Sequence, residues 1–150
     1  MRRLRRLALV AGLAGLAGLA GQAALAGGGA AAQAWINTVR AAEGRAPLAV
    51  SAALGRAALA HARDLTRSGR FGHTGRDGSS VQDRVRREGY RHCFVAENIA
   101  KGQATPEDAL RGWMASPAHR RNLLDPRAEA FGMARGAGRV WVLVLGRDGC

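Results

Sequence analysis

Cysteine, lysine and aromatic residues are scarce in this chain of 150 residues. The only two cysteines, Cys93 and Cys150, are too few for a small domain built on a disulfide framework. In an exported protein they can form one bridge, which would tie the C-terminus to the segment just before Glu97. Aromatic residues make up 5% of the chain, do not alternate with basic residues and belong to no nucleic-acid motif. We therefore expect no nucleic acid partner.

Arginine carries almost all of the positive charge, because Lys101 is the only lysine. The formal net charge is +12, from 23 basic and 11 acidic residues. Four of the arginines lie within the first six residues, and without them the net charge is about +8. This charge favours anionic surfaces such as cell-wall polymers or lipid headgroups. A general coding bias toward Ala, Gly and Arg is the simpler explanation.

The N-terminus has the pattern of a secretory signal peptide. Arg2 to Arg6 forms a charged region, Leu7 to Leu19 forms an apolar stretch, and Ala24-Leu25-Ala26 supplies a small-x-small cleavage site. Removal of this segment would yield a secreted or periplasmic protein that meets the membrane only transiently.

Three segments are predicted on this basis: a signal peptide over residues 1–26, a flexible mature N-terminus over 27–32 and one domain over 33–150. The alternative is an uncleaved membrane anchor, because residues 7–26 are about long enough to span a bilayer. Their high content of Ala and Gly makes them only mildly hydrophobic, which argues against the anchor.

Helix signals recur along the domain. Apolar spacing and capping residues predict five helices, which begin near Gln33 and after Ser51, Ser80, Thr105 and Ser116. Pro follows both Thr105 and Ser116, as is typical of a first helical position. The helix after Ser51 should end at Gly69.

Strand signals lie mainly near the C-terminus. Phe131 to Arg135 and Val140 to Leu145 are separated by Gly136-Ala137-Gly138, which predicts a hairpin. The second of these runs is apolar throughout and should be a central strand covered on both faces. Residues 90–99 are expected to be partly extended. A small sheet with helices on both sides follows.

Glu97 stands in the middle of an apolar run and needs a partner. An ionised carboxylate in such surroundings is costly unless it is paired. The candidates are His73, in a Gly-rich loop, and His119, in the first turn of the helix after Ser116. The positive end of that helix should lower the pKa of His119 and keep it neutral. By contrast, His61 lies on an apolar helix face and is expected to be a satisfied core histidine.

Several motifs occur in an order that resembles a known family. They are Ala60-His61-Ala62-Arg63-Asp64, Phe71-Gly72-His73, Asp83-Arg84, Gly89-Tyr90, Ala96-Glu97-Asn98-Ile99-Ala100, Trp113-Met114-x-Ser116-Pro117-x-His119-Arg120-x-Asn122-Leu123-Leu124 and Gly132. Together they resemble the CAP superfamily of cysteine-rich secretory proteins, antigen 5 and pathogenesis-related proteins, in its bacterial SCP-like extracellular branch. The resemblance extends from about Gln33 to Gly146. It implies an α+β fold, a three-layer α-β-α sandwich with a small, mainly antiparallel sheet.

The resemblance also implies a cleft lined by a tetrad of two histidines and two acids. His73 and His119 match the two histidines, and Glu97 matches the acid of the Glu-Asn element. Ser116 stands where many eukaryotic members have the second acid, which weakens the case for a complete metal site. The family implies a divalent cation such as zinc at His73 and His119, with Glu97 as a further ligand.

Three functions are open at this point. The favoured one is an exported, monomeric, non-enzymatic binding domain whose cleft holds a divalent metal, a lipid, an envelope component or a protein partner. The second is a metal-dependent hydrolase with zinc on His73 and His119 and Glu97 as general base. A Ser116–His119 nucleophile is a further enzymatic version, although Ser116 is more simply a helix cap. In the third, Glu97 hydrogen-bonds both histidines and is purely structural. No catalytic residue is assigned.

Overall fold

The computed structural model describes the backbone of residues 17–149 and the side chains of residues 29–149. The charged start of the predicted signal peptide lies outside the described residues. The described part contains five α-helices and a four-stranded sheet. The elements are α1 Ala17–Ala42, β1 Ala49–Val50, α2 Ala52–Ser68, α3 Val81–Arg87, β2 His92–Lys101, α4 Pro106–Ala115, α5 Pro117–Leu123, β3 Ala130–Gly136, a 3₁₀ turn Ala137–Arg139, and β4 Val140–Asp148.

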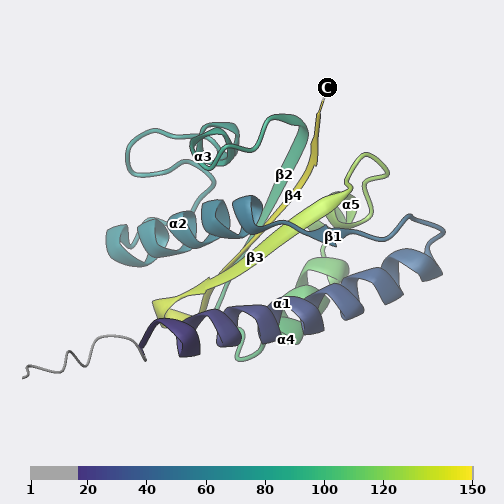
Figure 1. Ribbon diagram of the computed structural model, residues 1–150, viewed down its shortest axis with the longest axis horizontal. Coiled ribbons are helices and arrows are strands. Elements are labelled where there is room, and N and C mark those ends of the chain that lie inside the picture. Colours follow the sequence, from purple (N-terminus) through teal and green to yellow (C-terminus); the bar gives the residue numbers. More distant parts are fainter. Residues whose placement is uncertain (1–16, 150) are drawn as a thin grey trace, which may run out of the picture.

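The sheet lies between two layers of helices (Figure 1). Its strand order is β1-β3-β4-β2, with β1 parallel to β3 and the other neighbours antiparallel. One apolar cluster joins α2 and α3 to one face, and a second joins α1, α4 and α5 to the other. The predicted three-layer α-β-α sandwich with a mainly antiparallel sheet is therefore confirmed.

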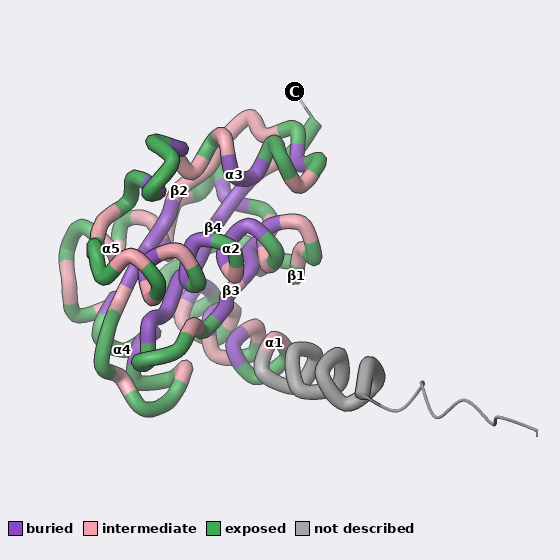
Figure 2. The backbone as a smooth tube through the Cα atoms, turned by 90° about the vertical axis from the view of Figure 1, so that its left-hand side faces the viewer, coloured by how far each residue is buried: buried purple, intermediate pink, exposed green. Residues whose placement is uncertain are grey.

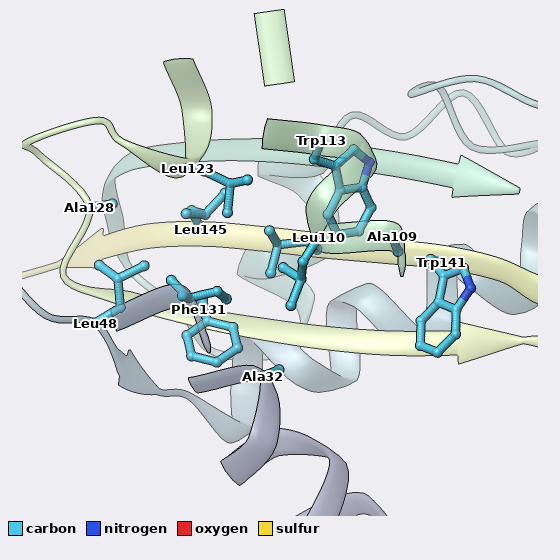
Figure 3. Packing of buried hydrophobic residues seen from close by; sticks show 12 residues of the cluster. Ala32, Leu48, Ala109, Leu110, Trp113, Leu123, Ala128, Phe131, Trp141 and Leu145 are labelled. Atoms are coloured by element: carbon cyan, nitrogen blue, oxygen red, sulfur yellow. The ribbon is translucent and has the colours of Figure 1, made fainter. Parts of the chain in front are cut away.

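Strand β4 contributes to both clusters. Successive side chains of a strand point to opposite faces of the sheet, so an apolar run of six residues has three on each side. Trp141, Leu143 and Leu145 belong to the cluster that includes residues of α1 and α4, and Val140, Val142 and Val144 belong to the cluster that includes residues of α2. Figure 3 labels Trp141 and Leu145 within the first cluster. The tube in Figure 2 is buried along this strand. The prediction of a central strand covered on both faces is confirmed.

Local capping residues fix where most helices begin and end. The Ser51 hydroxyl accepts a hydrogen bond from a backbone N–H in the first turn of α2, and α2 ends at Gly69 in a left-handed conformation with φ of 66°. Ser80 and Thr105 each form a complete capping box. These predicted boundaries are confirmed. Ser116 precedes α5 as predicted, but its side chain makes no capping hydrogen bond.

Helix α1 extends further toward the N-terminus than expected. It includes residues 27–32, where a flexible segment was predicted, and Ala32 is buried in the cluster beneath the sheet. Alanine has the highest helix propensity, and Ala32 shares a buried face with Ile36 one turn later. Cleavage after Ala26 stays a prediction. Among residues 17–149, no helix is long and apolar enough to cross a membrane.

The start of β2 and the end of β4 lie side by side near Cys93. His92 pairs with Asp148, and the N–H of Gly149 donates to the carbonyl of Arg91 at 3.2 Å. Cys150 lies outside the described residues, so the Cys93–Cys150 bridge stays a prediction. The strand register brings Asp148 and Gly149 beside the segment that contains Cys93.

At Gly132, helix α2 meets strand β3 backbone to backbone. A Cβ atom at Gly132 would overlap the backbone of Leu54 and Gly55. The backbone of a packed helix cannot move aside as the end of a flexible side chain can. Gly132 therefore sets the distance between α2 and the sheet.

We predict that Gly132→Ala lowers the free energy of unfolding by about 1–3 kcal/mol or more, because the added methyl group forces α2 away from β3. Urea denaturation measures the change. The matched control is Gly112→Ala in α4, where a Cβ has open space and alanine should stabilise the helix by up to about 1 kcal/mol. Equal stability of the two variants would contradict the close contact.

Candidate functional site

Glu97, on β2, is the centre of the site, and only 2% of its side chain is exposed. Oε1 accepts a hydrogen bond from His73 Nδ1 at 2.9 Å, and Oε2 accepts one from Arg84 Nη2 at 2.8 Å. The expected pairing of Glu97 with His73 is confirmed. The second partner is an arginine that was not among the predicted partners, and it gives the buried carboxylate a permanent counter-charge.

Arg84 links α3 to the loop that carries His73. Its guanidinium donates to the carbonyl oxygens of Ser79 at 2.8 Å and His73 at 3.0 Å. A signal for this role was present: Val81, Arg84 and Val85 share one face of α3 at helical spacing. An arginine on the apolar face of a helix needs a buried acceptor, and Glu97 is that acceptor.

His61 is buried in α2, as predicted for a core histidine, but it also forms a wall of the site. Its Nε2 donates to the carbonyl of Gly72 at 2.9 Å and lies 3.6 Å from Oε1 of Glu97. Burial lowers the pKa of His61, which favours the neutral ring. The proton on Nε2 leaves Nδ1 as an acceptor, and Nδ1 has no hydrogen-bond partner in the described part of the chain.

His119 belongs to a second pair. Its Nδ1 forms a hydrogen bond of 2.9 Å with the hydroxyl of Ser116, the residue expected to cap α5. Ser116 occupies the N-cap position of α5 as predicted, but its hydroxyl bonds to the imidazole and not to the helix end, so the expected side-chain cap is wrong. The hypothesis that Glu97 bonds both histidines is wrong for His119. The four predicted tetrad residues form two pairs, His73–Glu97 and Ser116–His119.

Side-chain amides position α5 against β2, and an indole positions α4 against the same strand. Asn98 donates to the backbone carbonyl of His119 at 3.1 Å, and Asn122 donates to Oδ1 of Asn98 at 2.8 Å. Asn122 also reaches the carbonyl of Glu97 at 3.4 Å, and the indole of Trp113 donates to the carbonyl of Ile99 at 3.1 Å. The amide contacts hold α5, which carries His119, beside β2, and the indole of Trp113 holds α4 against the same strand.

The pKa values of the two histidines are shifted in opposite directions. The hydrogen bond to Glu97 raises the pKa of His73. Burial, followed by the charge on nearby His73, lowers the pKa of His119. The direction for His119 is the one predicted from the sequence, but its main cause is burial and not the helix end. His119 thus stays neutral at pH values where His73 takes up a proton.

Both imidazole rings are held through Nδ1. For the described residues, the structure records no hydrogen bond that uses Nε2 of His73 or Nε2 of His119. The side chain of His73 is 58% exposed, and His119 is half-buried. A hydrogen bond at one ring nitrogen fixes the ring and directs the other nitrogen toward a ligand.

The donor set fits a divalent cation only in part. In residues 17–149, no three His, Cys, Asp or Glu side chains are grouped so as to hold a metal ion. Both oxygens of Glu97 are engaged, one of them by a cation, so Glu97 would support His73 from behind and not bind a metal directly. Two imidazole nitrogens supply half of a tetrahedral zinc site. Water or a bound molecule would supply the rest.

We predict that His73 titrates above the ordinary histidine value of 6.5 and His119 below it, which NMR titration of the ring protons measures. Protonated His73 stabilises the fold because its pKa is raised by folding. That contribution is fully present below the pKa of the unfolded chain and is lost as pH rises through the folded pKa. In Glu97→Gln the His73 midpoint should fall. A His73 midpoint below that of His119 would contradict these contacts.

We further predict that Glu97→Gln lowers the free energy of unfolding at pH 7 by about 3–5 kcal/mol, because it leaves buried Arg84 without an anion. The control Glu129→Gln removes a carboxylate that is 67% exposed and 4.0 Å from Arg147, and should cost less than about 1 kcal/mol. The double variant Glu97→Gln/Arg84→Met should recover part of the loss. Similar losses for Glu97→Gln and Glu129→Gln would rule out a buried ion pair.

The fold is similar to those of three bacterial proteins of known structure. An extracellular protein containing an SCP domain from Bacillus anthracis has a TM-score of 0.79 and 22% identity, over 90% of this chain and 45% of that protein. An outer surface protein of Borrelia burgdorferi has a TM-score of 0.71 and 19% identity, over 78% of this chain and 90% of that protein. A cysteine-rich secretory protein of Staphylococcus aureus has a TM-score of 0.69 and 18% identity, over 81% of this chain and 38% of that protein. At these identities the likeness shows the fold alone.

Sequence comparison extends the likeness from fold to family. The uncharacterized protein YkwD of Bacillus subtilis is 33% identical over 106 residues, which make up 70% of this chain and 41% of YkwD. The chain thus spans less than half the length of that relative. The cysteine-rich secretory protein family, CAP, matches residues 33–144. The chain belongs to the CAP family, in the bacterial branch that its motifs predicted.

Proposed function

We propose that this chain is an exported, non-enzymatic binding domain whose ligand meets the Nε2 atoms of His73 and His119. One observation carries the proposal. Glu97 and Ser116 each hold one imidazole through Nδ1, at 2.9 Å in both cases, so each ring is already oriented for a ligand. Groups fixed before binding lose little conformational freedom when the ligand arrives.

A divalent cation is the ligand class that suits these groups. Neutral imidazole binds zinc and other transition-metal ions, and the lowered pKa of His119 keeps that ring neutral. The carboxylate of Glu97 would make His73 a better donor, as a carboxylate behind a metal-binding histidine commonly does. With two protein ligands the cation alone would bind weakly. A lipid or an envelope component with oxygen donors would complete the site.

Export is supported by the signal pattern of residues 1–26 and by similar proteins. Two of the solved structures with this fold are described as extracellular and as an outer surface protein, respectively. We propose the same setting for this chain, secreted or periplasmic after cleavage of the signal peptide.

The hydrolase alternative is less well supported because Glu97, the general base that it requires, is already engaged. Both oxygens of Glu97 are engaged by His73 and Arg84, so Glu97 is poorly placed to take a proton from water. The Ser116–His119 pair has the separation of a nucleophile and its base. His119 lacks a carboxylate partner among the described residues, and a triad requires one to orient the imidazole.

We predict one weak zinc site, measured by calorimetric titration of the metal-stripped protein. His73→Ala and His119→Ala should each abolish binding, and Ser116→Ala should weaken it about tenfold by freeing the His119 ring. His92→Ala is the matched control, because it removes a histidine outside the site, and it should bind zinc as the parent does. If the His73→Ala/His119→Ala double variant binds as the parent does, or if neither binds, the proposal fails and the two pairs are structural.

A further inference from the structure

Phe71 is an aromatic residue that does not belong to either hydrophobic core. Of the three phenylalanines in the chain, Phe131 lies in the cluster beneath the sheet and Phe94 packs against that cluster. Phe71 belongs to neither cluster and is 51% exposed in the loop that follows α2. A ring that stays half in water contributes little hydrophobic stabilisation to folding. Its position is better explained by what it presents at the surface.

Two hollows meet at Phe71. The first has a volume of about 250 Å³ and is lined by residues between Ser68 and Arg76, including His73. The second has a volume of about 100 Å³ and lies between the end of α2, Lys101 and the turn at Gly138. Phe71 is the one residue that lines both hollows. An extended molecule could therefore cross the ring and occupy both sides of it.

The walls of these two hollows carry cations and no carboxylate. Arg70 and Arg76 line the first hollow, and Lys101 lines the second. The charged ends of Arg70 and Lys101 have no partner within the described residues. Two larger hollows, of about 890 and 270 Å³, differ because acids line both of them. The surface around Phe71 is therefore complementary to an anion.

We propose that Phe71 and its flanking cations bind an acidic sugar polymer. One pyranose ring would stack on Phe71, because the weakly positive C–H face of a sugar complements the negative face of an aromatic ring. Acid groups on the neighbouring sugars would meet Arg70 on one side and Lys101 on the other, whereas Arg76 already lies 3.9 Å from Asp64. This sugar site adjoins the proposed cation site at His73 but requires no metal ion.

The single ring favours a sugar over a membrane or a nucleic acid. Val50 and Phe71 are the exposed large apolar residues of the described surface, and they lie on separate segments. One ring is too little apolar surface to anchor a protein in a lipid interface. Single-stranded nucleic acids bind through several stacked aromatic rings, whereas this surface presents one.

The test uses probes that separate the sugar ring from its charge. Polygalacturonate and dextran sulfate carry carboxylates and sulfates, respectively, on pyranose rings. Dextran has the ring without the charge, and polyphosphate has the charge without the ring. By biolayer interferometry, at least one acidic sugar polymer should bind at least tenfold more tightly than dextran and polyphosphate. The binding should weaken with added salt. The tighter of the two acidic polymers identifies the acid group.

Variants then locate the site. Phe71→Ala should reduce binding at least tenfold without lowering the melting temperature, since the ring lies outside the cores, and Phe71→Trp should retain binding. Lys101→Glu should also reduce binding. The matched control Arg121→Glu makes the same change of charge beside another hollow and should bind as the parent does.

Several results would overturn the proposal. Binding that survives Phe71→Ala, or that is equally tight for polyphosphate, would be a charge effect only. Binding confined to phosphatidylglycerol vesicles would assign the surface to a membrane. His119 lines neither hollow, and the His119→Ala variant removes the proposed cation site. If His119→Ala still binds the polymer, the polymer site is separate from the cation site. If His119→Ala no longer binds the polymer, the proposal of a separate polymer site is wrong.

Discussion

The buried ion pair between Glu97 and Arg84 is the interaction on which this side of the molecule depends. A carboxylate at this depth is costly unless a cation meets it, and the carbonyl groups of Ser79 and His73 hold the arginine in place. The pair joins β2, α3 and the loop between α2 and α3. None of these can shift without leaving a charge unpaired in the interior. The position of the exposed His73 ring is thus set by two residues buried behind it.

Most of the fold could be predicted because its signals are local. The caps at Ser51, Ser80 and Thr105 act within one helical turn. The six-residue apolar run of β4 predicts a strand that is buried on both faces. Strand β1 was missed because two residues are too few to show a period, and its pairing with β3 joins positions about eighty residues apart. The early start of α1 could not be predicted because residues 27–29 are all glycine, which has low helix propensity, and the helix there is continuous with the part packed through Ala32.

The site could be predicted only where a residue was unusual for its surroundings in the sequence. Glu97, an acid in an apolar run, required a partner, and His73 was a correct choice. Arg84 was not foreseen because its place on the apolar face of α3 indicates that it needs an acceptor but does not say which one. Ser116 shows the opposite error: the Ser-Pro pattern favours a cap, but the imidazole of His119 competes for the same hydroxyl and binds it. Tertiary contacts decide such competitions, and local patterns do not record them.

Side-chain donors close one outer edge of the sheet. An edge strand with unpaired carbonyl groups is a template on which another chain can add a strand, as happens in strand exchange and amyloid growth. On β2, Trp113 and Asn122 occupy the outward carbonyls of Ile99 and Glu97. The opposite edge, β1, is two residues long and offers little to pair with. The hydrogen bonds that hold α4 and α5 against β2 therefore also cover part of this edge of the sheet and leave fewer carbonyls free for another strand.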